Sequence, residues 1–361
     1  MGYRFEGPRL GVVAVSRSVG RRAVLASVAV FAAGALGLAG CSEPATTGSG
    51  ATSDSAAASG EVTLYTSEPQ VKIDEIISAF NEEQPDIEVK VFRAGTGDLK
   101  ARIEAERSTG AVAADILLAA DVPTFEQYKD QDLFQEFEPS EADAIEDVAV
   151  DPDGFYVGTR IIPTVIAYNT GDVTDPPTSW AELAEPEYLD RIILPNPDVS
   201  GAAAFNAAAW SLQPDLGEEW INRLGANNPQ VAESNGPVSQ AVAEGSKPVG
   251  IVVDYLVRDL AAQGSPIAVS YPSEGVPYIT QPGAVFADAP NPEAAKLFLD
   301  FIVSQKGQQI AVEQNYLPVR DDAGTPEGAP ALTDITLFDQ DLEAIAASQD
   351  EAVAAFNAAV R

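Results

Sequence analysis

The chain has 361 residues, with 55 acidic and 21 basic side chains and a formal net charge of −34. It contains no histidine and one cysteine, which excludes a Ser-His-Asp triad, a histidine-ligated zinc site and a disulfide within the chain. The negative charge argues against nucleic acid as a partner, because phosphate contacts need clustered lysine and arginine. The length indicates two domains or one large one, and 45% hydrophobic residues are enough for a packed core.

The first 40 residues have the pattern of a bacterial export signal. Five arginines and a single acid are followed by an apolar run over residues 23–39. Arg21-Arg22 fits twin-arginine export in part, and general secretion remains open. Leu38-Ala39-Gly40-Cys41 resembles the lipobox of bacterial lipoproteins. We therefore predict a signal peptide over residues 1–40 and a lipid on Cys41 that anchors the protein to the outer face of the cell membrane.

Residues 41–60 are predicted to be the lipidated cysteine and a disordered tether, because they are rich in Ser, Thr, Ala and Gly. Residues 41–361 together hold 16 bases and 54 acids, a net charge of −38. We interpret this acidity as a solvated surface.

The body of the chain alternates between strand and helix patterns. Ile73, Ile76, Ile77 and Phe80 recur at helical spacing, and Ile87, Val89 and Val91 alternate with other residues as in a strand. This alternation predicts an α/β fold built on a mostly parallel sheet. The expected strands are 62–65, 87–92, 116–118, 160–168, 192–194 and 250–254. The expected helices are 73–84, those beginning after Gly97, Pro123 and Pro292, and 202–212, 235–243, 255–262, 305–313 and 342–360.

Several short motifs occur along the chain in an order that resembles the order found in a known family. They lie at residues 62–67 (VTLYTS), 114–118 (ADILL), 200–203 (SGAA), 250–255 (GIVVDY), 291–296 (NPEAAK) and 307–308 (GQ). Their order over residues 61–330 is similar to that of the solute-binding proteins of bacterial ABC importers. The branch is the one that binds ferric iron, phosphonates and sugar phosphates, with thiamine and polyamine relatives.

The resemblance implies a two-lobed periplasmic binding protein of type 2. Each lobe would be a mixed, mostly parallel sheet flanked by helices, with the ligand in a cleft that closes by hinge motion. Lobe 1 is expected over residues 61–160 and 280–330, and lobe 2 over 161–279 and 331–361. The chain would cross between them near residues 158–168 and 276–285. The implied partners are a permease, its ATPase and a small solute; we expect a monomer that is not an enzyme and needs no cofactor.

The candidate ligand-binding residues lie mostly where strands lead into helices. A helix start offers unpaired N–H groups and a positive dipole end, which suit an oxyanion. Ordinary helix capping is the alternative for each of these residues. The segment Ser200-Gly201-Ala202 matches the family segment that holds an anion. The candidates of this kind are Thr66, Ser67, Thr96, Gly97, Ser200, Gly201, Ala202 and Asn235.

Four further candidates are charged or phenolic. Arg160 lies at the expected hinge, where its guanidinium suits phosphate or carboxylate, although a salt bridge is the alternative. Asp254 and Tyr255 end a buried strand, and Asp121 follows another. Tyr255 matches one of two adjacent tyrosines that bind ferric iron in relatives.

The rest of that iron-binding ligand set is incomplete in this sequence. Leu256 takes the place of the second tyrosine, and Pro69 stands near the place of a histidine. Asp121 is out of register with the acidic ligand. No firm metal site is predicted, and Tyr255 is the candidate if iron is bound.

The resulting interpretation is a lipid-anchored binding protein of an ABC importer. Its ligand would be an oxyanion, such as a phosphonate or a phosphorylated metabolite, or ferric iron with an anion. Binding of a polyamine or thiamine is an alternative, since acids with Tyr65, Tyr255 and Tyr278 suit a cationic pocket. A hydrolase that uses two carboxylates, or a sensor that docks on a receptor, are the other classes.

Overall fold

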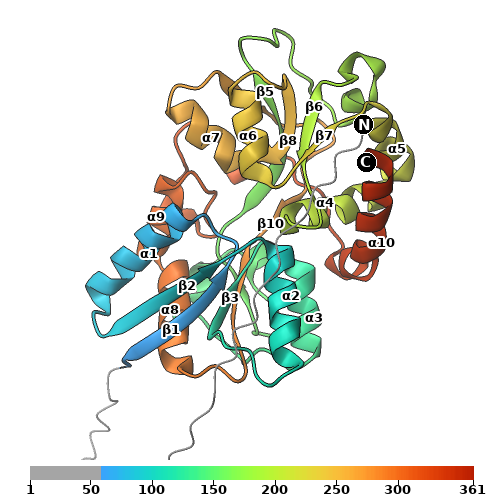
Figure 1. Ribbon diagram of the computed structural model, residues 1–361. Coiled ribbons are helices and arrows are strands. Elements are labelled where there is room, and N and C mark those ends of the chain that lie inside the picture. Colours follow the sequence, from blue (N-terminus) through green and yellow to red (C-terminus); the bar gives the residue numbers. More distant parts are fainter. Residues whose placement is uncertain (1–57) are drawn as a thin grey trace, which may run out of the picture. The chain divides into compact units, whose positions relative to one another are not determined.

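The computed structural model describes residues 58–361, which belong to one compact unit (Figure 1). The predicted signal peptide and Cys41 lie outside the described residues. Within residues 58–361, no helix has both the length and the apolar character that crossing a membrane requires.

One sheet has five strands in the order β2-β1-β3-β11-β4. Strand β1 pairs in parallel with β2 and β3, and β11 pairs antiparallel with β3 and β4. The strands are β1 (Gly60–Thr66), β2 (Ile87–Arg93), β3 (Ile116–Leu118), β4 (Val157–Gly158) and β11 (Pro282–Val285). The helices with this sheet are α1 (Gln70–Glu83), α2 (Thr96–Arg107), α3 (Val122–Asp130), α8 (Pro292–Val303) and α9 (Gln305–Glu313). We call this sheet and these helices lobe 1.

The second sheet has the order β10-β5-β8-β6-β7, with β9 also paired to β5. Strand β6 is parallel to β7 and β8, whereas β5 is antiparallel to its neighbours. The strands are β5 (Ile162–Asn169), β6 (Ile192–Pro195), β7 (Gln230–Ala232), β8 (Val249–Val253), β9 (Ile267–Ser270) and β10 (Tyr278–Ile279). The helices with this sheet are α4 (Gly201–Leu212), α5 (Gly217–Ala226), α6 (Asn235–Ala243) and α7 (Asp254–Ala262). We call these elements lobe 2.

The last helix, α10 (Leu342–Val360), packs against α4 and α5 and also against α3. Short 3₁₀ helices lie in the connections: η1 (Ala142–Ala144), η2 (Asp147–Ala149), η3 (Ala181–Ala184), η4 (Pro186–Tyr188), η5 (Asp321–Ala323) and η6 (Leu332–Asp334).

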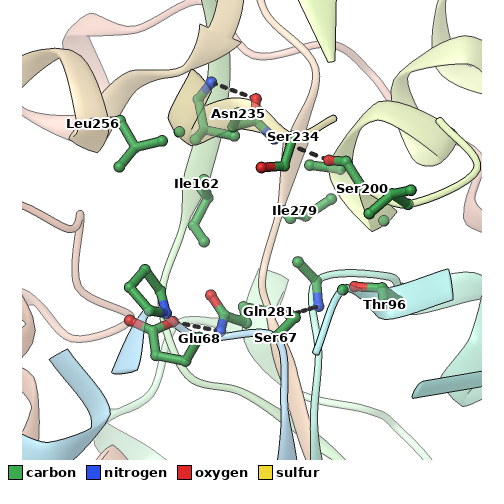
Figure 2. A pocket seen from close by; sticks show the side chains of 18 of the residues that line it. Ser67, Glu68, Thr96, Ile162, Ser200, Ser234, Asn235, Leu256, Ile279 and Gln281 are labelled. Carbon is green, nitrogen blue, oxygen red and sulfur yellow. Dashed lines mark hydrogen bonds between the residues drawn. The ribbon is translucent and has the colours of Figure 1, made fainter. Parts of the chain in front are cut away.

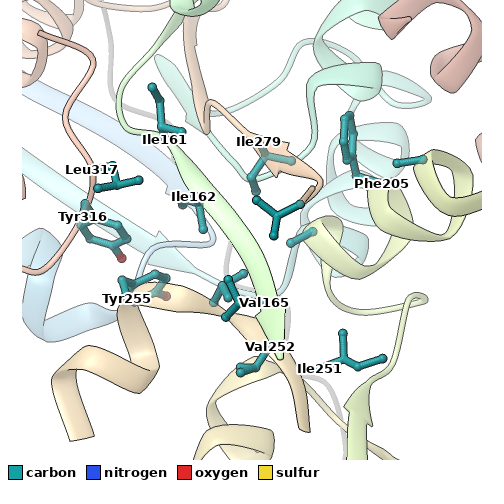
Figure 3. Close-up of a cluster of buried hydrophobic side chains, with 14 of the residues drawn as sticks. Ile161, Ile162, Val165, Phe205, Ile251, Val252, Tyr255, Ile279, Tyr316 and Leu317 are labelled. Atoms are coloured by element: carbon teal, nitrogen blue, oxygen red, sulfur yellow. The ribbon is translucent and has the colours of Figure 1, made fainter. Parts of the chain in front are cut away.

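Two connections lead from one sheet to the other. The chain leaves β4 for β5 through residues 159–161, and it leaves β10 for β11 through residues 280–281. The segment after α9 joins them there, because Leu317 forms a β-bridge with Ile161. Buried apolar side chains fill this junction, among them Ile161, Ile279 and Leu317 (Figure 3). The predicted fold class, two α/β lobes with flanking helices, is confirmed.

The helices form where one apolar face meets a sheet. In α1, Ile73, Ile76 and Phe80 are buried on one face, and the helix ends just before Pro85, which cannot continue it. Helix α4 differs, because its residues 201–210 are all buried, between α10 and the other elements of lobe 2. Trp210 in this helix packs its ring against those of Trp180 and Trp220, which also contact each other.

We expect Gly225→Ala to destabilise the protein by about 1–3 kcal/mol, although alanine is the better helix former. A Cβ at Gly225 would lie 2.2 Å from the backbone oxygen of Ala359, so α5 and α10 would have to separate. Gly236→Ala in α6 is the control, since nothing lies within 4 Å of its added Cβ. Urea unfolding followed by circular dichroism measures both variants; equal stability of the two would contradict the prediction.

Candidate functional site

A cavity of about 390 Å³ lies between the two lobes (Figure 2). Polar groups line it above and below a middle formed by Ile162 and Ile279. The residues of lobe 1 that line the cavity are Ser67, Glu68, Pro69, Arg93, Gly95, Thr96 and Ala120. The lining side from lobe 2 consists of Val199, Ser200, Gly201, Ala202, Ser234, Asn235, Gly236, Pro237, Val253, Tyr255 and Leu256. Gln281, from the crossing between the sheets, completes the lining.

Five helices begin at the wall of this cavity. The residue before the first turn of α1, α2, α4, α6 and α7 lines it in each case, from Pro69 to Val253. The first N–H groups of a helix have no partner within the helix, and the dipole there is positive. The helix starts of both lobes therefore favour a negatively charged ligand in the cavity.

The hydrogen bonds at Ser200 leave a donor for a ligand. The Ser200 Oγ accepts from the N–H of Ala203 at 3.3 Å and from Asn235 Nδ2 at 2.9 Å. The Asn235 Oδ1 in turn accepts from the N–H of Val253 at 3.3 Å. With these acceptors occupied, the Ser200 hydroxyl hydrogen and the second Nδ2 hydrogen of Asn235 are left to donate.

Lobe 1 offers donors in the same way. The Ser67 Oγ accepts from the N–H of Ala120 at 3.3 Å, so its own hydrogen can be donated. Arg93 ends β2 and is exposed at the cavity wall, where its Nε lies 3.4 Å from the carbonyl oxygen of Glu68. Among residues 58–361, Arg93 is the one basic side chain in the lining.

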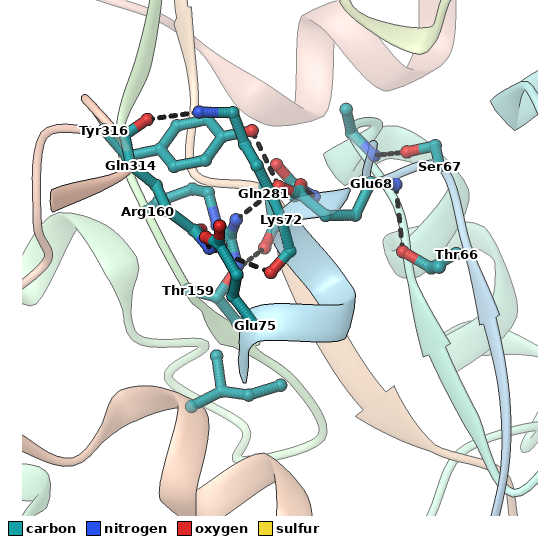
Figure 4. A network of polar contacts seen from close by, with 12 residues as sticks. Thr66, Ser67, Glu68, Lys72, Glu75, Thr159, Arg160, Gln281, Gln314 and Tyr316 are labelled. Carbon is teal, nitrogen blue, oxygen red and sulfur yellow. Dashed lines mark hydrogen bonds and ion pairs between the residues drawn. The ribbon is translucent and has the colours of Figure 1, made fainter. Parts of the chain in front are cut away.

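Of the residues that the structure describes, Glu68 is the one acidic side chain in the lining, and its carboxylate is already bound (Figure 4). Its Oε1 lies 2.9 Å from a guanidinium nitrogen of Arg160 and accepts from the Tyr316 hydroxyl at 2.7 Å. Its Oε2 accepts from Gln281 Nε2 at 2.7 Å. Because Glu68 and Arg160 are both about 1% exposed or less and form an ion pair, they add no net charge to the cavity.

The phenol of Tyr255 lies against that of Tyr316, with ring centroids 4.2 Å apart. Burial raises the pKa of both phenols above the ordinary value, and the nearby Glu68 carboxylate acts in the same direction. Both groups are therefore neutral phenols at neutral pH. Within residues 58–361, no cluster of three or more Asp, Glu, His or Cys side chains is arranged to hold a metal ion.

The structure brings seven of the predicted site residues together in the cavity lining. They are Ser67, Thr96, Ser200, Gly201, Ala202, Asn235 and Tyr255. Their contact with a ligand stays a prediction.

Five predicted residues lie outside this lining, each for a physical reason. Thr66 is fully buried, and its Oγ1 accepts a hydrogen bond from the N–H of Glu68. Arg160 forms an ion pair with the Glu68 carboxylate. Asp254 is fully buried and pairs with Arg258 at 2.7 Å. Burial raises the pKa of the Asp254 carboxyl.

Gly97 and Asp121 line a smaller cavity of about 220 Å³ next to the first one. The N–H of Gly97 donates to the carbonyl oxygen of Val199 at 3.4 Å, and a Cβ at Gly97 would lie 2.1 Å from the oxygen of Asp198. Gly97 therefore lets the two lobes touch. Asp121 binds Thr124, Gln349 and Lys100, and burial raises its carboxyl pKa.

Sequence reasoning missed Arg93, Glu68 and Gln281. Arg93 could have been found, because it ends a parallel strand just before Gly95-Thr96, where ligands bind in such sheets. No local signal marks Glu68 or Gln281, since their partners lie more than 90 residues away.

The fold and this cleft correspond to a known class of protein. Residues 112–341 match the sequence model of the bacterial extracellular solute-binding proteins, and the chain belongs to that family. It is 26% identical over 278 residues to the iron uptake protein A1 of Synechocystis sp., covering 71% of this chain and 74% of that protein. It is also 25% identical over 283 residues to an uncharacterized protein of Haemophilus influenzae, covering 73% of this chain and 79% of that protein.

Solved periplasmic binding proteins share the fold. The protein AfuA from Actinobacillus pleuropneumoniae, with fructose-6-phosphate bound, superposes with a TM-score of 0.74 at 24% identity, over 82% of this chain and 97% of that one. Iron-bound HitA from Pseudomonas aeruginosa superposes with a TM-score of 0.73 at 22% identity, over 83% of this chain and 99% of that one. The resemblance predicted from the sequence is confirmed for family and for the type 2 fold.

We expect Arg160→Met to lower the free energy of unfolding by about 3 kcal/mol, because it leaves the buried Glu68 carboxylate without its cation. The matched control is the double variant Arg160→Met, Glu68→Gln, which removes both charges and should be more stable than the single one. Urea denaturation measures both variants. A loss below about 1 kcal/mol for the single variant, the range of exposed ion pairs, would contradict the expectation.

Proposed function

We propose that this protein captures a small oxyanion, a phosphonate or a phosphorylated metabolite, between its lobes and delivers it to the permease of an ABC importer. The observation that carries the proposal is the excess of donors in the cavity. The side-chain oxygens of Ser67, Ser200, Asn235 and Glu68 accept hydrogen bonds within the protein, whereas hydroxyl, amide and guanidinium hydrogens of Ser67, Ser200, Asn235 and Arg93 are left over. An oxyanion carries only hydrogen-bond acceptors, so it can bind all of these unused donors.

The charge of the cavity supports an anion rather than a polyamine or thiamine. The surface of the body is strongly acidic, yet the single acid in the lining is neutralised by Arg160. Within the described part of the chain, a cationic ligand would find no carboxylate in the lining free of a partner, and it would lie beside Arg93. Nor does the lining formed by residues 58–361 hold the pair of free carboxylates that the hydrolase alternative needs.

Ferric iron held with an anion is the second candidate, favoured by the similarity to the Synechocystis iron uptake protein and by Tyr255 in the lining. The iron would be the transported solute, bound through hard oxygen ligands. Tyr255 would have to lose its proton, which its burial opposes.

We further propose that the protein is an exported, monomeric lipoprotein anchored through Cys41, with residues 42–60 as a tether and a permease and its ATPase as partners. The family is one of extracellular binding proteins, which is in accord with export and with a role in binding rather than catalysis.

Thermal unfolding of residues 42–361 against ferric citrate, phosphate esters, aminoalkylphosphonates, polyamines and thiamine tests the ligand class. A ligand present at 100 times its dissociation constant should add about 2.7 kcal/mol of stability. We expect the phosphorus compounds to raise the melting temperature. A shift with ferric citrate alone would select the second candidate, and a shift with polyamines or thiamine alone would contradict both.

We expect Arg93→Gln to weaken binding of the best phosphorus compound about tenfold or more, since a hydrogen bond to a charged group is lost. Arg191→Gln is the matched control: Arg191 is also exposed and loses the same charge, but it lies outside the cavity lining. Titration calorimetry measures both variants. Equal affinities for the two would show that Arg93 does not contact the ligand.

A further inference from the structure

Helix α10 contacts both lobes of the protein. It runs along α4 and α5 of lobe 2 and also packs against α3 of lobe 1 (Figure 1). It begins at Leu342, directly after the segment 112–341 that matches the family. The helix is therefore outside the matched segment, yet it lies beside the cleft that the family fold forms.

The attachment of α10 to lobe 2 is extensive. Phe356 stacks on Trp210 of α4, with ring centroids 6.2 Å apart and the planes at 21°. Gly225 of α5 lets the backbone of Ala359 approach closely. Asn357 Nδ2 donates to Asp198 Oδ1 at 2.8 Å, just before α4. These contacts attach α10 to lobe 2.

The polar contact of α10 with lobe 1 is made by Gln349. Its Nε2 donates to Asp121 Oδ1 at 3.1 Å, and the two residues are 5% and 1% exposed. Asp121 lies between β3 and α3 of lobe 1, where it also accepts from Thr124 and has Lys100 Nζ at 3.7 Å. A buried carboxylate is therefore shared between α10 and groups of lobe 1.

The contact lies where the lobes touch. The residue before Asp121 is Ala120, and a Cβ at Gly201 would lie 2.4 Å from the Ala120 oxygen. On the same side, the N–H of Gly97 donates to Val199 across the lobes. If the lobes separated, α10 would withdraw Gln349 from Asp121, and water would reach the carboxylate. In a molecule whose lobes separate while α10 stays on lobe 2, this hydrogen bond is broken.

We propose that α10 is a strap that stabilises the closed arrangement of the two lobes through the hydrogen bond between Gln349 and Asp121. A ligand held between the lobes binds in proportion to the closed fraction, so the strap raises the apparent affinity for any such ligand. The inference goes beyond the proposed function and does not depend on which solute is bound.

The experiment measures the distance between the lobes without ligand. Spin labels are placed on residues 42–361, which include the whole compact unit and lack Cys41, through Ala105→Cys in α2 and Gln240→Cys in α6. Both positions are exposed. Pulsed electron paramagnetic resonance then gives the distance distribution. Gln349→Glu sets a second carboxylate against Asp121, and we expect the ratio of open to closed molecules to rise about tenfold or more.

Two further variants separate the strap from general support of the fold. Asn357→Ala removes an amide–carboxylate hydrogen bond from the same helix, but one made to lobe 2, and should leave the distance distribution as in the parent. Adding Asp121→Asn to Gln349→Glu restores an amide–carboxylate pair with its sides exchanged and should return the closed distance. If the Gln349→Glu variant does not fold, Gln349→Ala replaces it, because alanine removes the hydrogen bond to Asp121 without adding a charge.

The proposal is overturned if Gln349→Glu and Gln349→Ala leave the distances unchanged, or if Asn357→Ala opens the lobes equally. Because no ligand is added, these outcomes are independent of the thermal-shift panel that tests the proposed function.

Discussion

The ion pair between Glu68 and Arg160 is the interaction on which the cleft depends. It joins the end of β1 to the passage between β4 and β5, and Gln281 and Tyr316 bind the same carboxylate from the other two segments at the junction. Charges buried this deeply are costly unless they are paired. The pair can therefore persist only if the end of β1 and the three segments at the junction, which carry Arg160, Gln281 and Tyr316, keep their positions. It thereby ties lobe 1 to the strands that lead into lobe 2, and it also removes the one acid of the cavity from competition for a ligand.

An acidic protein can hold an anion if its charges are arranged unevenly. The carboxylates of this chain are mostly on the surface, where water and salt screen them beyond about 10 Å. The cavity instead collects helix starts, hydroxyl groups and Arg93. Short-range hydrogen bonds in a partly dry cleft are stronger than the screened repulsion of a distant surface. This separation of surface from site is why the net charge says so little about the solute.

Much of the fold could be predicted from the sequence, because periodicity is a local property. The helices at residues 70–83, 201–212 and 342–360 and the strands β1, β2 and β8 follow from the spacing of apolar side chains. The strands that escaped prediction were β4, β7, β9, β10 and β11, which have two to four residues each, and the α-helix that escaped prediction was α5. A strand of two residues carries no readable alternation, and it exists only because a partner strand from another part of the chain supplies its hydrogen bonds.

The sequence by itself determined the α/β class, the family and the small-residue helix starts such as Ser200-Gly201, all of which depend on short stretches of chain. Only the tertiary structure decided which polar groups face the cavity. Arg160 and Arg93 are both arginines close to strand ends, yet Glu68, 92 positions from Arg160, binds the first and leaves the second at the cavity wall. Gly97 was expected to admit a ligand, but Asp198 of the other lobe occupies that space. Such outcomes depend on contacts between segments far apart in the chain, which local spacing does not encode.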